Sequence, residues 1–322
     1  MSGEAAPRAT LVLNPAARGG AASVAAAAAE ALRARGVAVD VVHTAAPGAC
    51  VTAARDAVQR GGHGSLVVAV GGDGTAREVA QGMAEGIGTW PHGGPAPDGA
   101  PRLLILPAGT GNSVHKALWD DRSWTDTLEA ALDGSAVRRD LDLLRIEGHD
   151  RAVLLGASAG FLRWSVEATA RFPELSGREL YATAGLAAAQ ELRPFAGRVS
   201  VDGRLLAEGP MALAAVGGAR RRGGSLVLFP RSLLDDGLLD VCVLQASGPD
   251  DAIPLLMGAM EGRHLDLPGV HYAQGRAVIL ECLDGALAFE HDGDLWSGDD
   301  ATLRISVVPR AVPVVSPPSW QE

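Results

Sequence analysis

The residues best suited to chemistry lie in the turn Gly71–Thr75, whose sequence GGDGT holds three glycines and one carboxylate. It follows the short, Val-rich run Ser65–Val70, typical of a buried parallel strand, and precedes a helix-forming stretch. Glycines let the backbone approach a phosphate closely, and a helix start offers unpaired N–H groups and partial positive charge. An acid beside polyphosphate repels it unless the acid binds a metal ion or takes up a proton. The pattern favours phosphoryl transfer, and the alternative is that Asp73 merely caps the following helix.

A second phosphate-compatible turn, Pro107–Asn112, follows the strand-like run Leu103–Leu106 and precedes the helical stretch Ser113–Trp119. It offers two glycines and a Thr hydroxyl at a helix start. Lys116 lies one helical turn further on and could reach a phosphate oxygen, although an exposed helix lysine is the simpler interpretation.

A third motif, Gly156–Gly160, matches the G-x-S-x-G nucleophile elbow of serine hydrolases. Three histidines follow it in the chain as candidate partners: His264, His271 and His291. The elbow belongs in a parallel sheet, however, whereas Ser158 lies in a strand-rich region, and a hydrolase leaves Gly71–Thr75 unexplained. We therefore expect Ser158 to be a packing or cleft residue.

The first third of the chain alternates between strand and helix. Apolar runs predict strands at Ala9–Leu13, Val37–His43, Leu66–Val70 and Arg102–Leu106. Helices are predicted between them at Ala21–Arg35, Cys50–Arg60 and Thr75–Glu85. This alternation implies a doubly wound parallel sheet, whose ligands bind at the carboxyl ends of the strands. Both glycine turns follow such strand ends, and so do Asn14 and Thr44.

Beyond about Gly134 the strand-like runs follow one another with short turns. They are Asp140–Ile146, Ala152–Leu155, Arg198–Val201, Met211–Val216, Leu238–Leu244, Ala277–Cys282 and Ala286–Phe289. One helical region, Glu179–Leu192, interrupts them. Consecutive strands predict an antiparallel β domain such as a sandwich. We therefore expect an α/β domain at residues 1–133, with the tail 308–322 packed back on it, and a β-rich domain at 134–307.

Composition excludes several classes of protein. The 322 residues are 47% apolar and carry a formal net charge of -10, which argues against a nucleic-acid partner and against broad docking on an anionic membrane. The run Arg220–Arg222 is a candidate local basic patch. Three scattered cysteines, Cys50, Cys242 and Cys282, predict reduced thiols. With no signal-peptide or membrane-span pattern, we expect a cytoplasmic protein, in which any work on lipid would be peripheral.

A resemblance to a known family connects these motifs. In order, Leu13–Pro15, Val70–Thr75 with Glu78, and Pro107–Asn112 resemble the catalytic domain of diacylglycerol and sphingosine kinases, most of all the soluble bacterial lipid kinases. Later segments extend the likeness over nearly the whole chain: Asp142–Ile146, Ser158–Phe161, Asp236–Val241 and Asp292–Asp294. NAD kinases share the Gly-Asp-Gly turn, but the later motifs fit the lipid kinases better.

The resemblance implies an ATP-binding α/β domain, NAD kinase-like in fold, a β-sandwich domain, and an active site in the cleft between them. It implies phosphorylation of a hydroxyl on a lipid or lipid-like alcohol, with ATP and Mg²⁺. The residues that would contact the nucleotide are Asn14, Thr44, Gly71, Gly72, Gly74, Thr75, Glu78, Gly109, Thr110 and Lys116. Asp73, Asp142 and Asp236 would hold the metal ion, and Asp73 and Asp294 would be the catalytic carboxylates, Asp294 as general base.

Three departures from the family pattern leave alternatives open. Ser113 stands where the lipid kinases usually carry an Asp, Asp294 is one methylene shorter than the usual Glu, and arginines replace an Asn- and Gly-rich stretch around 217–225. The alternatives are a kinase for a secondary-metabolite alcohol and a nucleotide-binding pseudokinase with a regulatory role. Transient peripheral contact with a membrane and a homodimer both remain compatible with the sequence.

Overall fold

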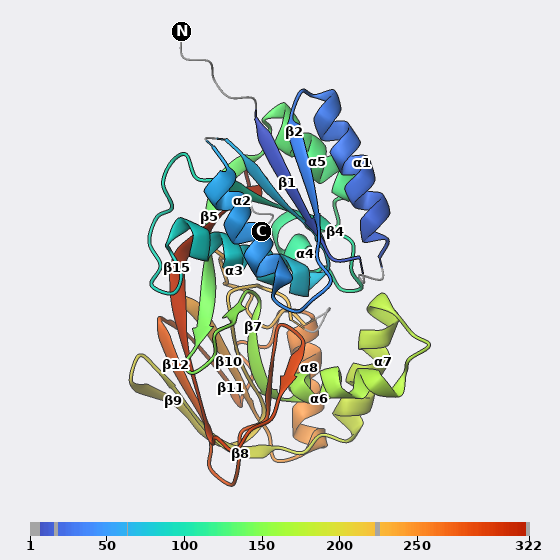
Figure 1. Cartoon of the computed structure of the whole chain (residues 1–322). Helices are drawn as coiled ribbons and strands as arrows, with labels where there is room; N and C mark the ends of the chain where they lie inside the picture. The colour runs from blue at the N-terminus through green and yellow to red at the C-terminus, as the bar shows by residue number, and fades with distance from the viewer. Residues whose placement is uncertain (1–6, 16–18, 63, 223–225, 320–322) are drawn as a thin grey trace. The chain divides into compact units, whose positions relative to one another are not determined.

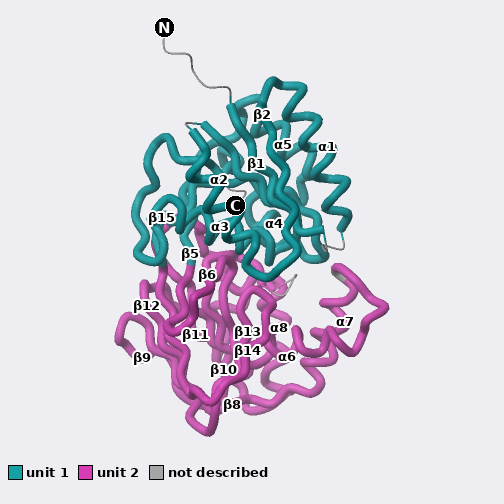
Figure 2. The backbone as a smooth tube through the Cα atoms, in the orientation of Figure 1, with its two compact units in different colours: residues 1–143, 308–322 teal, residues 144–307 magenta. Residues whose placement is uncertain are grey.

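The computed structural model describes residues 7–15, 19–62, 64–222 and 226–319. The chain divides into two compact units, unit 1 with residues 1–143 and 308–322 and unit 2 with residues 144–307 (Figure 2). The first division falls inside strand β5 (Val137–Ile146), further along the chain than position 133, because this strand continues from one unit into the other. The last strand, β15 (Thr302–Ser316), likewise contributes residues to both units.

Unit 1 is built on a parallel sheet with the order β2-β1-β3-β4, extended beside β4 by the end of β15. Its strands are β1 (Arg8–Leu13), β2 (Ala38–His43), β3 (Leu66–Gly71) and β4 (Arg102–Pro107). Every residue of β3 is buried, as expected for an apolar run that is covered on both faces. The edge strand β2 instead exposes most of its residues.

Helices lie on both sides of this sheet (Figure 1). They are α1 (Ala21–Ala34), α2 (Ala49–Arg60), α3 (Asp73–Ile87), α4 (Ser113–Trp119) and α5 (Trp124–Asp133). Helix α2 packs along α3, and α1 contacts α5. The predicted doubly wound α/β arrangement is therefore confirmed, α4 matches the helical stretch predicted after the second glycine turn, and only α5 adds to the predicted set.

Unit 2 is antiparallel apart from its links to unit 1. Its strand order is β14-β13-β7-β9-β8-β12-β15, with β10 pairing with β9 and β11, and β6 with β5. The strands are β6 (Ala152–Val153), β7 (Gly156–Gly160), β8 (Phe195–Val201), β9 (Arg204–Gly217), β10 (Leu239–Gln245), β11 (Val270–Gly275), β12 (Ala277–Cys282), β13 (Phe289–His291) and β14 (Asp294–Trp296).

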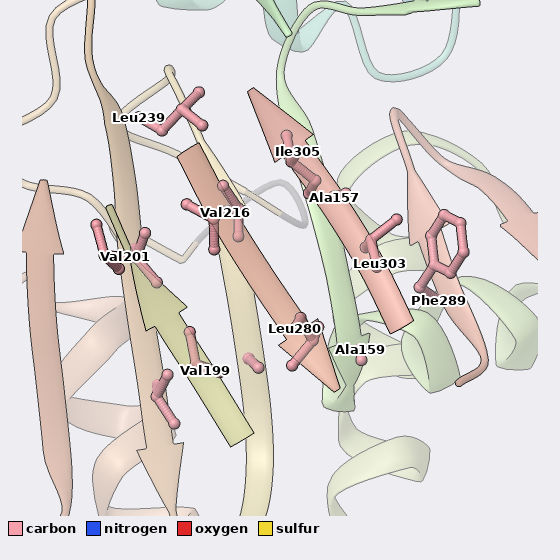
Figure 3. Close-up of a cluster of buried hydrophobic side chains, with 14 of the residues drawn as sticks. Ala157, Ala159, Val199, Val201, Val216, Leu239, Leu280, Phe289, Leu303 and Ile305 are labelled. Carbon is pink, nitrogen blue, oxygen red and sulfur yellow. The ribbon is translucent and has the colours of Figure 1, made fainter. Parts of the chain in front are cut away.

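Strand β10 shows how the two cores of unit 2 are organised. Val241 and Val243 join a core between strands, shown in Figure 3, while Cys242 and Leu244 join a second core with the helices. Successive side chains of a strand point to opposite faces, so a strand buried on both faces is apolar throughout. This explains the unbroken hydrophobic run of β10.

The helices of unit 2 are α6 (Phe161–Ala168), the short 3-10 turn Thr169–Arg171, α7 (Gly177–Gln190) and α8 (Pro249–Met260). Only the region of α7 was predicted. Helix α8 begins with Pro249 and contains Pro254, residues that usually interrupt a helix pattern. The Pro-rich tail 309–318, for which no strand was predicted, forms most of the second half of β15 and pairs with β4 through Val314.

Candidate functional site

The turn Gly71–Thr75 is folded tightly on itself at the carboxyl end of β3. Gly71 is the last residue of the strand, and α3 begins two residues later at Asp73. Thr75 is 7% exposed, and its hydroxyl lies where a side chain on Gly71 would begin, because a Cβ there would stand 2.5 Å from Thr75 Oγ1. The sequence motif therefore requires glycine at Gly71 for packing within the turn itself.

The two glycine turns touch each other. A Cβ on Gly109 would stand only 2.3 Å from the Cα of Gly72, so a larger residue at position 109 would force the turns apart. The Ala108 N–H also donates to the Gly71 carbonyl, at 2.8 Å. The second turn is closed by Asn112, whose side-chain oxygen accepts from the Gly109 N–H and whose Nδ2 donates to the Gly109 carbonyl, both at 2.9 Å. The two predicted phosphate turns thus form one continuous backbone surface.

Asp73 links the same two turns. Its Oδ1 accepts the N–H of Val114, in the first turn of α4, at 2.9 Å. Asp73 is itself the first residue of α3, whose N-cap is Gly72. Its carboxylate is half-buried and caps α4, the helix that follows the second turn, so it does more than cap its own helix.

The other residues predicted to contact a nucleotide lie in different environments. Thr44 is 5% exposed, and its hydroxyl donates to the Leu13 carbonyl at 3.0 Å and lies 3.1 Å from Cys50 Sγ. Burial, and secondarily the charge of Glu78, raises the pKa of the Cys50 thiol. Glu78 itself accepts the Gly48 N–H at 3.4 Å.

Several of the predicted contact residues are open to solvent. Gly74, Thr110 and Lys116 are exposed, and Asn14 is half-buried directly after β1. The loop after β1 reaches the second turn, because the Gly19 N–H donates to the Ala108 carbonyl at 3.1 Å. Three strand ends are thus brought together at one sheet edge, with exposed polar groups beside them.

The three predicted metal ligands are not brought together as a cage. Asp142 is buried in β5, where its Oδ1 accepts the Arg310 N–H at 2.7 Å. Asp236 lies in an exposed turn of unit 2, where its Oδ1 accepts the Leu238 N–H at 2.9 Å. Among the residues for which the structure gives positions, no three His, Cys, Asp or Glu side chains are grouped as metal ligands.

In unit 2, the segment Asp292–Asp294 forms the turn of the β13–β14 hairpin. Asp292 and Gly293 have φ angles of 48° and 87°, as the two central residues of a tight hairpin turn require. The Asp292 carboxylate accepts three backbone N–H groups, from Leu154 and Leu155 at 2.8 Å each and from Gly156 at 3.2 Å. Asp292 therefore attaches the turn to the segment that leads into β7.

Glu290 is a second buried acid at this turn. Its side chain is 2% exposed, and its Oε1 accepts from Ser158 Oγ at 2.5 Å and from Arg222 Nη2 at 2.6 Å. Its Oε2 accepts the Gly293 N–H at 3.0 Å. The sequence reasoning assigned no role to Glu290; the available signal was a charged residue directly after the apolar run Ala286–Phe289.

These contacts agree with one expectation and correct another. Ser158 is 1% exposed inside β7, between β13 and β9, and bonds to an acid, as expected for a packing residue and not for the nucleophile of a hydrolase. Arg222 is 5% exposed and paired with Glu290, so the basic patch contains only Arg220 and Arg221 at the surface.

Asp294 stands in contrast to the two buried acids. Its side chain is 49% exposed, and its Oδ2 lies 3.5 Å from Nη1 of Arg151, which is also exposed. Two residues further along β14, the Trp296 ring packs on His149 with centroids 4.3 Å apart. Partial burial, and then the charge of Arg151, lowers the pKa of His149, so this ring is neutral at neutral pH. Asp294 is thus an accessible carboxylate beside an aromatic surface.

Comparison with known proteins identifies the family. The model of the diacylglycerol kinase catalytic domain matches residues 8–145, and that of the YegS C-terminal NAD kinase beta sandwich-like domain matches residues 156–316. A relative from Pseudomonas aeruginosa, named "Probable lipid kinase YegS-like", is 32% identical over 258 residues, 79% of this chain and 77% of the relative. This chain belongs to the bacterial lipid kinase family.

Other relatives of this lipid kinase family member agree. The diacylglycerol kinase of Bacillus subtilis is 27% identical over 238 residues, 73% of this chain and 72% of the relative. The crystal structure of a diacylglycerol kinase from Bacillus anthracis has a TM-score of 0.67 at 15% identity, covers 98% of both chains, and bears on the fold alone.

For this lipid kinase family member, the comparisons confirm the predicted resemblance and fold class, a parallel α/β domain followed by a β-sandwich domain. Membership makes it a phosphotransferase of the kinase class. The first matched region holds both glycine turns, and the second holds the Asp292–Asp294 hairpin. Within the described ranges, no helix combines the length and the apolar character needed to cross a bilayer.

Proposed function

We propose that this lipid kinase family member transfers the terminal phosphoryl group of ATP to a hydroxyl of a lipid or lipid-like alcohol. The observation that carries the proposal is the joined pair of glycine turns, with Gly72 against Gly109 and Asp73 bonded across to Val114. Such a backbone surface at the carboxyl ends of parallel strands suits a polyphosphate. In this proposal Gly71, Gly72, Gly74, Thr75, Gly109 and Thr110 contact the phosphates, and Asn14, Thr44, Glu78 and Lys116 contribute to nucleotide binding.

Mg²⁺ fits beside Asp73 better than at the other two predicted ligands. The ion is usually held by one or two carboxylates together with substrate phosphates, so a full protein cage is not needed. Asp73 is half-buried between the two turns, whereas Asp142 is buried and Asp236 lies in a separate turn of unit 2. When bound, Mg²⁺ would neutralise phosphate charge, and Asp73 would keep it next to the turns.

Asp294 is the proposed general base. An alcohol at neutral pH needs a carboxylate within hydrogen-bond reach to remove its proton during transfer. Asp294 is 49% exposed and would accept the proton on a carboxylate oxygen, whereas the side chains of Glu290 and Asp292 are only 2% and 1% exposed. Exposed Leu295 and Trp296, which adjoin Asp294 in β14, would suit an acceptor with an apolar body.

The test is a transfer assay with radiolabelled ATP and Mg²⁺ across hydroxylated lipids and small alcohols. Asp73→Asn retains an oxygen for the Val114 N–H but loses the charge, so we expect transfer to be abolished while α4 stays capped. Asp294→Ala should lower kcat by about 10²- to 10⁴-fold and change the KM for ATP little, because a base acts in the transition state. A lipid product heavier by one phosphoryl group would identify the acceptor.

Matched controls are the exposed acids Asp56→Asn on α2 and Asp299→Ala after β14, both expected to be neutral. Full activity of Asp294→Ala would contradict the assignment of the base. Binding of ATP without transfer to any acceptor would favour the pseudokinase, which the residues Ser113 and Asp294 motivate. Transfer to small alcohols alone would favour a kinase of secondary metabolites.

A further inference from the structure

A cluster of buried charges surrounds the hairpin turn of unit 2. The side chains of Arg222, Glu290 and Asp292 are 5%, 2% and 1% exposed. Arg222 Nη2 lies 2.6 Å from Glu290 Oε1, and Nη1 lies 4.0 Å from Asp292 Oδ1. The guanidinium group therefore stands between two carboxylates that flank the same turn. Burying three charges is costly, so a buried group of this kind is weak evidence for stability, whereas fixing one conformation is an attested use.

Each carboxylate holds the turn to a different part of the sheet. Glu290 accepts from Ser158 of β7 on one side and from the Gly293 N–H of the turn on the other. Asp292 accepts the N–H groups of residues 154–156. Arg222 contacts both Glu290 and Asp292 and lies outside the hairpin, in a segment where its backbone pairs with that of Leu226. Two segments of unit 2, residues 154–158 and the segment of Arg222, thus meet the hairpin around Asp292–Gly293.

The strand that follows the turn is short and exposed. β14 comprises Asp294–Trp296, all three residues are exposed, and in the described part of the chain its one strand neighbour is β13. It also contacts α6, pairs with Arg151 through Asp294, and packs Trp296 on the rings of His149 and Phe289. A three-residue edge strand has few ladder hydrogen bonds, so the turn contributes to fixing where it lies.

We propose that Arg222 is a positioning residue for Asp294: by holding Glu290 and Asp292, it fixes the turn and through it the direction of the Asp294 carboxylate. This inference rests on the proposed role of Asp294 as general base. Arginine suits the task because its planar fork presents several donors at once, which lysine cannot do. It also gives a role to one of the arginines that stand in place of the family's Asn- and Gly-rich stretch.

The test removes both charges of the closest pair together. Removing one partner alone would leave an uncompensated buried charge and could unfold the protein, whereas loss of both is far less destabilising. The variant is the full-length double substitution Arg222→Met with Glu290→Gln. Arg221→Met, next to it and exposed, is the matched control.

The first readout is the position of β14, independent of catalysis. Protein labelled with 5-fluorotryptophan gives a ¹⁹F NMR signal for Trp296, assigned with Trp296→Phe, and Trp119, buried in unit 1, serves as the internal reference. We expect the Trp296 signal of the double variant to shift or broaden and to lose its response to titration of His149. The Trp119 signal should stay unchanged, which shows that unit 1 is folded, and an unchanged Trp164 signal shows the same of unit 2, since Trp164 packs against a core of that unit.

The second readout is turnover with the acceptor found in the transfer assay. The double variant should lose about tenfold or more in kcat, with the KM for ATP unchanged, and Arg222→Lys should recover only part of the loss. An unmoved Trp296 signal, or a moved signal with full kcat, would overturn the inference. If the unmodified protein transfers no phosphate, the proposed function fails, and the Trp296 signal alone then decides whether Arg222 positions the hairpin.

Discussion

At the scale of single residues, acids that look alike in the sequence have different tasks. Asp73 accepts a hydrogen bond from the N–H of Val114 at the start of α4, and Asp292 accepts hydrogen bonds from the N–H groups of residues 154–156. Asp294, two residues after Asp292, is half-exposed, and one of its contacts is an ion pair with Arg151 at 3.5 Å. An ion pair between exposed groups contributes about 1 kcal/mol or less. Accessibility separates the candidate base from its buried neighbours.

Lys116 offers a residue-scale test of nucleotide binding, because it is the one lysine among the 322 residues. It is exposed on α4, the helix that follows the second glycine turn. Reductive methylation should therefore modify Lys116 and the N-terminus alone, and saturating ATP should slow the reaction at Lys116. Mass spectrometry of tryptic peptides measures both sites, and the N-terminus is the internal control. Equal rates with and without ATP would remove Lys116 from the nucleotide site.

His115, the neighbour of Lys116, predicts a pH dependence of stability. It is 2% exposed and its Nε2 lies 3.0 Å from Thr127 Oγ1, and burial, with the charge of Lys116 second, lowers its pKa from 6.5 to about 4. Between these values the unfolded chain binds the proton more tightly, so the free energy of unfolding falls as pH falls. The loss should reach about 2 kcal/mol by about pH 5.

Urea unfolding at neutral and acidic pH measures this loss, and His115→Gln should remove about that much of the pH dependence. An identical dependence in wild type and variant would contradict the assignment to His115.

At the scale of elements, the decisive contact is between two loops of unit 1. The ends of β3 and β4 are neighbours in register, Gly71 opposite Pro107, so the turns that follow must share one space. Glycine at 72 and 109 allows the two backbones to touch, and Asp73 and Asn112 then close the arrangement with hydrogen bonds. The backbone surface that could bind a phosphate is therefore formed by the two glycine turns together.

Gly109→Ala tests this pairing. Its Cβ would stand 2.3 Å from the Gly72 Cα, which forces a backbone shift that we expect to cost about 1–3 kcal/mol and to weaken ATP binding. The matched control for stability is Gly74→Ala, whose Cβ meets no atom within 4 Å and which lies in the first turn of α3. It is not a control for ATP binding, because Gly74 is itself a proposed phosphate contact. That control should unfold no more easily than wild type, since alanine favours helix. Calorimetric titration with ATP and urea unfolding measure both, and unchanged ATP affinity in Gly109→Ala would contradict the shared-surface model.

At the scale of the whole molecule, charge limits how the protein can meet a lipid. The net charge is -10, and the exposed arginine run is shortened to two residues by the burial of Arg222. Exposed apolar side chains lie in unit 2, including Ile253, Met257 and Met260 on α8 and Leu295 and Trp296 on β14. Any contact with a membrane surface should therefore depend on apolar side chains more than on charge.

Vesicle sedimentation checks this expectation. Binding to phosphatidylglycerol vesicles should not exceed binding to phosphatidylcholine vesicles. Added salt should not weaken binding to phosphatidylglycerol, because it screens the repulsion between the negatively charged protein and the anionic lipid. Binding that rises with anionic lipid and falls with salt would contradict the expectation and point to a basic surface.

The sequence by itself determined the fold class and the positions of the two glycine turns, because buried strands and glycine-rich helix starts leave local patterns. Helix α8 and the second half of β15 were not predicted, because prolines disfavour helix and strand locally and tertiary packing overrides that preference. Only the tertiary structure decided that Gly109 lies against Gly72, that Ser158 is buried against Glu290, and that Arg222 is an internal ion-pair partner. These contacts join residues as far apart as 132 positions in the chain, and no local pattern records them. Hydrophobic periodicity predicts which residues of a segment are buried. The partner of a buried charged residue depends instead on how distant segments pack together.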